Sequence, residues 1–173
     1  DFVGDATDLR LADEVFHFQP YPGVTRAIFI AAPHRGSPTA DGLLGRLART
    51  LVGQRAPEID ALRRLARSNA SYIREDLRAL YQLGLLNSIT TLQTAQPVRT
   101  AAQSLLPAGI PYHTIAGSLP GREPQTDGFV PLQSTQLPGA ASTLVVESGH
   151  DVYENAAAVA EVLRILREDL GGR

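Results

Sequence analysis

Four residue types with distinctive chemistry are missing from this chain of 173 residues: cysteine, methionine, tryptophan and lysine. The absence of Cys excludes disulfides, thiolate nucleophiles and zinc-thiolate sites, and it leaves the compartment open because secreted proteins can also lack Cys. All 16 basic residues are Arg, which excludes a Schiff base on Lys and a phosphate-loop Lys. The chemistry of the chain therefore involves neither a thiol nor a lysine amine.

Charge blocks and long apolar runs are missing as well. The net charge is −2, and no basic block is longer than the Arg63-Arg64 pair, so electrostatics gives no reason to expect nucleic acid or an anionic membrane as partner. No apolar run reaches the roughly 18 residues of a membrane span. A neutral or apolar substrate fits better.

The length and the 43% hydrophobic content are typical of one globular domain over residues 1–173. Because a chain that starts at Asp1 and contains no Met is not a complete translation product, we expect a longer natural protein that is truncated here at its N-terminus. Any signal peptide would then lie upstream, which leaves the localisation undecided.

Three apolar segments predict strands: 25–32, 111–118 and 142–146. The first has the unbroken apolar character of a strand buried on both faces. Strands separated by helical segments predict an α/β fold, with parallel strands covered by helices. If its edge is left open, strand 25–32 would be a template for pairing or aggregation, so we expect stability only beside an N-terminal half or a homologous partner.

Helical spacing of apolar residues occurs in three further segments: 41–53, 57–80 and 155–170. The first two fall in a region, 41–104, that we expect to cover the sheet edge or to form a helical cap. The stripe along 57–80 is typical of ordinary core packing, and a lid over a lipid-binding cleft is the alternative. In the last helix we expect these residues to face inward: Val159, Val162, Leu163, Leu166 and Leu170.

Asp127 and His150 are the best candidates for catalysis, because each follows a predicted strand and the two could meet at one end of a parallel sheet. A buried carboxylate beside an imidazole fixes its tautomer and stabilises the imidazolium of a nucleophilic mechanism. Alone, the Asp127-Gly128 pair would be an ordinary turn. His17 and His113 lack such a context and are expected to be surface or packing histidines.

Ser37 lies in a turn between a strand and a helix, as a nucleophile would, but its neighbours exclude that role. A nucleophile elbow needs small residues two positions away, where Arg35 and Thr39 stand. The next residue must also donate its N–H to the oxyanion, and Pro38 has none. No G-x-S-x-G occurs elsewhere in the sequence.

Metal and cofactor motifs are also missing from the sequence. It has no H-E-x-x-H, no G-x-G-x-x-G, no phosphate loop and no pair of His at metal-ligand spacing. Asp127 with Asp151 is too small a set for calcium. We expect a reaction that needs no cofactor.

Three motifs resemble those of bacterial α/β-hydrolases of the lipase and esterase kind. PHRGSP at 33–38 is similar to that family's TPHRGSP segment, with Ala32 replacing Thr; TDGFVP at 126–131 is similar to its SDGxVP loop; and SGH at 148–150 is similar to its histidine segment. The resemblance runs from about Val24 to the end and includes the closing helix. It implies the C-terminal portion of an α/β-hydrolase fold.

The resemblance assigns the triad acid to Asp127 and the triad histidine to His150, and it implies a Ser nucleophile and an oxyanion donor upstream of Asp1. His34 and Arg35 would shape their loop without a chemical role. The implied activity is hydrolysis of an ester or lipid-like small molecule, with this chain inactive by itself. Two alternatives stay open: an acyltransferase with the same triad, and a non-catalytic binding module.

Overall fold

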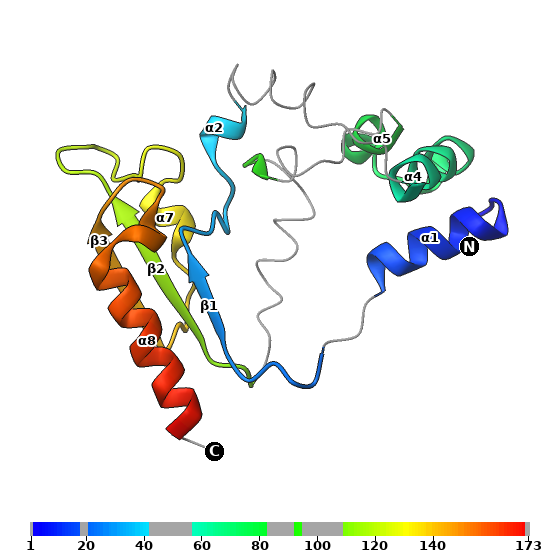
Figure 1. Cartoon of the computed structure of the whole chain (residues 1–173). Helices are drawn as coiled ribbons and strands as arrows, with labels where there is room; N and C mark the ends of the chain where they lie inside the picture. The colour runs from blue at the N-terminus through cyan, green and yellow to red at the C-terminus, as the bar shows by residue number, and fades with distance from the viewer. Residues whose placement is uncertain (1, 18–20, 42–56, 83–91, 95–108, 172–173) are drawn as a thin grey trace. The chain divides into compact units, whose positions relative to one another are not determined.

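The structure, a computed structural model, describes residues 2–17, 21–41, 57–82, 92–94 and 109–171 (Figure 1). The chain forms two compact units, one from residues 1–20 and 43–91 and the other from 21–42 and 92–173. The second unit contains the sheet. No helix among the described residues is long and apolar enough to cross a membrane.

Among the described residues the sheet has three parallel strands in the order β1-β2-β3: β1 Ala27–Ile30, β2 Tyr112–Ser118 and β3 Ser142–Glu147. β1 and β2 fall within the predicted segments, β3 extends one residue beyond its own, and the α/β class with parallel strands is confirmed. Short helical elements lie in the connections: α2 Pro38–Asp41, α7 Leu132–Thr135 and η3 Val152–Glu154. The central strand β2 is buried along Tyr112 to Gly117, as expected of a strand with two neighbours.

Strand β1 is shorter and more exposed than its apolar run predicted. It spans four residues, all of them partly exposed, and Ile30 keeps 37% of its surface accessible. Among the described residues β1 pairs only with β2, so it is an edge strand of this sheet. The prediction of burial on both faces was therefore wrong for the chain by itself.

The closing helix α8, Ala156–Gly171, covers one face of the sheet (Figure 1). Its N-cap is Asn155, whose Oδ1 accepts from the N–H of Ala157 at 2.9 Å and of Ala158 at 3.3 Å. Ala158 lies in the core with residues of β2, β3 and η3: Ile115, Val146 and Val152. Val162 packs against the same cluster.

The inward face of α8 differs from the one predicted. Ala158 and Ile165 are buried and Val162 is partly buried, whereas four predicted core residues are between 43% and 70% exposed: Val159, Leu163, Leu166 and Leu170. Ala158, Val162 and Ile165 follow one another at helical spacing on the inward face, so positions 159, 163, 166 and 170 fall on a different face of the helix. The prediction chose the stripe with the larger apolar side chains. It was wrong because α8 carries two apolar stripes and the sheet covers the other one.

The described part of the first unit contains these helices: α1 Ala6–Phe16, α4 Pro57–Ser68, η1 Ala70–Tyr72 and α5 Glu75–Gln82. Asp8 of α1 receives two hydrogen bonds from the guanidinium of Arg64 on α4, at 2.6 and 2.7 Å. An open, mostly apolar groove of about 930 Å³ lies among α1, α4 and α5. Leu62 and Leu65 are among the residues that line it.

The segment 57–80 is two helices and not one continuous stripe. Asn69 ends α4: its side-chain amide donates to the carbonyls of Leu65 at 2.9 Å and Val3 at 2.7 Å, and its Oδ1 accepts from the N–H of Val3. The bond to Leu65 satisfies a carbonyl group in the last turn of α4, and the chain turns after Asn69. The predicted helix 41–53 and much of the predicted cap 41–104 lie outside the described residues.

Candidate active site

Two loops that leave the sheet bring Asp127 and His150 together. Asp127 lies in the connection after β2, and His150 follows β3 directly. Nδ1 of His150 donates to Oδ2 of Asp127 at 2.7 Å. The structure thus places the two residues that the sequence singled out within hydrogen-bond distance.

The loop around Asp127 is built to hold its carboxylate. Oδ1 accepts from the backbone N–H of Phe129 at 2.9 Å and of Val130 at 2.6 Å. Gly128 has a φ of 100°, a conformation that favours glycine, and its N–H bonds the hydroxyl of Thr126 at 3.0 Å. Because Asp127 is only 2% exposed, these bonds compete little with water and fix the orientation of the carboxylate.

His150 is held on one side and open on the other. Since a carboxylate only accepts, the bond to Asp127 places the proton on Nδ1 and leaves the lone pair on Nε2. No described residue bonds Nε2, and the side chain is 46% exposed. The ring of Phe129 lies against the imidazole, with centroids 5.5 Å apart and planes tilted by 51°. This geometry suits a general base that reacts through Nε2, the ring nitrogen on the side away from Asp127.

Gly117 is a site residue that the sequence reasoning missed. A Cβ on this residue of β2 would lie 2.8 Å from the carbonyl oxygen of Gly149 and 2.9 Å from that of Ser148. It would also lie 2.8 Å from a methyl group of Val152. The loop that carries His150 therefore crosses β2 at a distance that only glycine permits. The sequence signal that could have indicated this close approach was a glycine near the end of a predicted strand.

The loop at 33–38 packs beside the Asp127 loop. Gly36 has a φ of 81°, and a Cβ there would lie within 2.9 Å of the backbone of Leu92 and Thr94. Ser37 is buried, its N–H donates to the carbonyl of Leu92 at 2.8 Å, and its hydroxyl donates to the carbonyl of Phe129. The Ser37 hydroxyl is thus engaged in a loop-to-loop contact.

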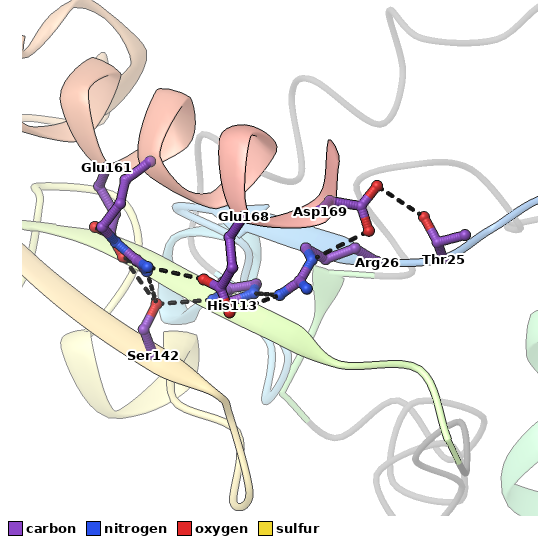
Figure 2. Close-up of polar contacts among 8 residues, drawn as sticks. Thr25, Arg26, His113, Ser142, Glu161, Glu168 and Asp169 are labelled. Atoms are coloured by element: carbon purple, nitrogen blue, oxygen red, sulfur yellow. Dashed lines mark hydrogen bonds and ion pairs between the residues drawn. The ribbon is translucent and has the colours of Figure 1, made fainter. Parts of the chain in front are cut away.

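The other two histidines considered from the sequence each have bonding partners of their own. His17, at the end of α1, is exposed and bonds Asp13 at 2.5 Å. His113 is buried near the start of β2, in the polar cluster of Figure 2. Both positions agree with the surface and packing roles predicted for them.

The cluster around His113 joins the starts of the strands to α8 (Figure 2). Arg26 donates to Nε2 of His113 at 2.8 Å, which leaves the proton on Nδ1, and Nδ1 donates to Ser142 Oγ at 2.8 Å. Ser142 in turn donates to Glu161 at 2.8 Å. Burial lowers the pKa of His113, and the charge of Arg26 lowers it further.

The outer part of this cluster consists of ion pairs along α8. Arg164 bonds Glu161 and Glu168, and Arg26 bonds Asp169 at 3.5 Å. The hydrogen bonds from Arg164, with a smaller contribution from Ser142, lower the pKa of Glu161 to about 2. The cluster therefore consists of satisfied pairs and accounts for His113 without a catalytic role.

No group of three or more His, Cys, Asp or Glu that could hold a metal occurs in the part of the chain that the structure describes. In particular, Asp127 and Asp151 do not belong to such a group.

Comparison with solved structures gives a distant likeness. The course of the chain resembles that of a lipase. The mature form of lipase BlEst2 from Bacillus licheniformis matches with a TM-score of 0.45 and 18% sequence identity, over 82% of this chain and 54% of the lipase chain. The chain thus spans about half the length of that protein. No family model matches the sequence, and no curated protein is significantly similar to it.

Proposed function

We propose that this chain supplies the acid and the histidine of a serine hydrolase that cleaves carboxylic esters. The observation that carries the proposal is the bond between Asp127 and His150. It joins a buried carboxylate, already fixed by two backbone N–H groups, to an imidazole whose second nitrogen bonds none of the described residues. This is the arrangement that activates a serine hydroxyl.

In the proposed reaction the nucleophile is a Ser outside residues 1–173. Nε2 of His150 takes the proton of that hydroxyl as its oxygen attacks the ester carbonyl, and then gives the proton to the departing alcohol. In the second half, water attacks the carbonyl of the acyl-enzyme while Nε2 of His150 takes its proton. The proton then passes to the Ser oxygen, and the carboxylic acid product leaves. Asp127 stabilises the imidazolium in both halves, so neither step needs a cofactor.

The surroundings of His150 favour an apolar substrate group. Phe129 is 57% exposed while its ring lies against the imidazole, so it offers an apolar surface beside the reacting nitrogen. The chain as a whole is nearly neutral. An ester with an apolar acyl or alcohol part fits these properties better than a charged one.

Replacing either residue tests the proposal in the full-length protein. His150→Ala and Asp127→Ala should each lower kcat on a short-chain p-nitrophenyl ester by about two orders of magnitude or more, with the circular dichroism spectrum unchanged. His17→Ala is the matched control, because His17 is exposed just after the end of α1, and it should retain the activity of the parent protein. Near-normal turnover in the His150 or Asp127 variant would end the assignment.

A fluorophosphonate probe, which labels activated serines, locates the nucleophile in the same protein. We expect one labelled Ser outside residues 1–173, and labelling that fails in His150→Ala. A label on Ser37 would overturn its exclusion. Product analysis with added alcohol then separates hydrolysis from acyl transfer, because an acyltransferase would form the new ester in place of the acid.

A further inference from the structure

The PHRGSP segment has no chemical role in the proposed reaction, yet its Ser37 and the nearby Thr39 of α2 both bond one peptide group of the loop that carries Asp127. The carbonyl of Phe129 accepts from the hydroxyl of Ser37 and from that of Thr39, the latter at 3.1 Å. Thr39 also donates its N–H to Ser37 Oγ at 3.2 Å. Two hydroxyls from one loop therefore hold a single carbonyl of another.

That carbonyl belongs to the same peptide plane as the N–H of Val130. A peptide group is planar and trans, so fixing the direction of its C=O also fixes the direction of its N–H. The N–H of Val130 donates to Oδ1 of Asp127 at 2.6 Å, while Oδ2 of Asp127 accepts from His150 at 2.7 Å. A continuous line of hydrogen bonds thus runs from Ser37 and Thr39 through this peptide and Asp127 to His150.

The two loops are fastened at a second point. Ser134 of α7 donates its hydroxyl to the carbonyl of Gly36 at 2.6 Å and accepts from the N–H of Arg35 at 3.1 Å. Ser37 and Ser134 are 5% and 3% exposed, so water competes little for these bonds. A buried carbonyl that loses such a donor stays unsatisfied or pulls its peptide into a new orientation.

We propose that Ser37 and Thr39 are positioning residues for the Asp127–His150 pair, acting through the peptide group between Phe129 and Val130. Their hydroxyls set the plane of this peptide, which aims a backbone N–H at Asp127 and keeps the ring of Phe129 against His150. The same constraint aligns Asp127 with Nδ1 of the imidazole. This inference rests on the proposed function and gives the PHRGSP segment its role.

Steady-state kinetics of four variants of the full-length protein test the proposal. Ser37→Ala should lower kcat about tenfold and Thr39→Val about threefold with KM nearly unchanged, because alignment of the pair matters in the transition state and not in substrate binding. Thr39→Ser keeps the hydroxyl and should restore the parent rate. Thr135→Val is the matched control, because it removes a buried hydroxyl that bonds the carbonyl of Leu132 and not that of Phe129.

Proton NMR provides a readout that does not depend on turnover. The Nδ1 proton of His150, held by Asp127, should resonate far downfield in the parent protein and in Thr135→Val, and it should shift upfield and exchange faster in Ser37→Ala. If this signal and kcat are the same in Ser37→Ala, Thr39→Val and Thr135→Val, the two hydroxyls are merely structural and the proposal is wrong. Parent-like activity of His150→Ala would instead overturn the proposed function itself.

Discussion

The candidate site depends on positions where a single atom decides whether two segments can approach. Gly117 shows this most directly, because the backbone of Ser148 and Gly149 occupies the space where a Cβ would be. Interiors are packed too tightly to absorb such an overlap without a shift of the backbone. The residue that must then move is the neighbour of His150.

We therefore expect Gly117→Ala to displace the His150 loop. The unfolding free energy should fall by about 1–3 kcal/mol, as for other overpacked cores, and ester hydrolysis by the full-length protein should fall with it. Gly171→Ala is the matched control: a Cβ at Gly171 meets nothing within 4 Å, so stability should change by only about 0.5 kcal/mol. Chemical denaturation and the p-nitrophenyl ester assay measure both effects, and a Gly117→Ala variant as stable and active as its control would contradict the close approach.

At the scale of elements, the cluster around His113 attaches α8 to the starts of the three strands. His113 on β2 is bonded to Arg26, which precedes β1, and to Ser142 at the start of β3. From α8 it faces three charged groups: Glu161, Arg164 and Glu168. Protonation of His113 would remove the acceptor for Arg26 and bring two positive charges together.

This arrangement predicts a loss of stability in mild acid. Because the folded state lowers the pKa of His113 below its ordinary value of 6.5, the folded protein binds fewer protons than the unfolded chain under mildly acidic conditions. The stability that neutral His113 contributes is fully present above pH 6.5. It is lost as the pH falls from there toward the lowered pKa, at up to about 1.4 kcal/mol per pH unit. Urea denaturation at several pH values between about 8 and 5 measures the slope.

His113→Gln removes the titrating group and serves as the comparison for that slope. The variant should be less stable than the parent at pH 8, but its stability should fall less steeply between pH 6.5 and about 5. The two slopes should differ by at most the uptake of one proton on unfolding, about 1.4 kcal/mol per pH unit. The carboxylates in the cluster are present in both proteins, so the difference isolates His113. Equal slopes in the two proteins would show that folding does not lower the pKa of the His113 imidazole.

At the scale of the whole chain, the described part of the second unit leaves an apolar helix stripe and a strand edge open. On α8, Val159, Leu163, Leu166 and Leu170 form one exposed stripe, and β1 has a free edge among the described residues. Exposed apolar stripes and unpaired strand edges both favour association. Residues 1–173 studied without any further chain should therefore self-associate.

Sedimentation velocity over a range of micromolar concentrations tests this expectation. We expect species larger than the monomer that grow with concentration, and a shift toward monomer when Leu163 and Leu166 are both replaced by Gln. These two side chains are 45% and 47% exposed, so their replacement should cost little folding stability. A monomeric, soluble and cooperatively unfolding chain would show that the exposed stripe and edge are tolerated.

Much of the local structure was predictable because its causes are local. An apolar run predicted each strand, and the helical spacing of apolar residues in 155–170 predicted α8. Asp127 and His150 were found because parallel strands place the loops at their carboxyl ends side by side. Their proximity is seen in the structure, while their part in catalysis stays a prediction.

The sequence by itself determined the class of fold, the three strands and the pair of residues that could carry chemistry, since turn chemistry and apolar periodicity act over a few residues. Only the tertiary structure decided which stripe of α8 meets the sheet, what satisfies His113 and what the hydroxyl of Ser37 bonds. Ser37 and its acceptor Phe129 are 92 residues apart, and Arg26 and His113 are 87 apart. No local pattern encodes such partners, because the contact exists only when the sheet has brought both segments together.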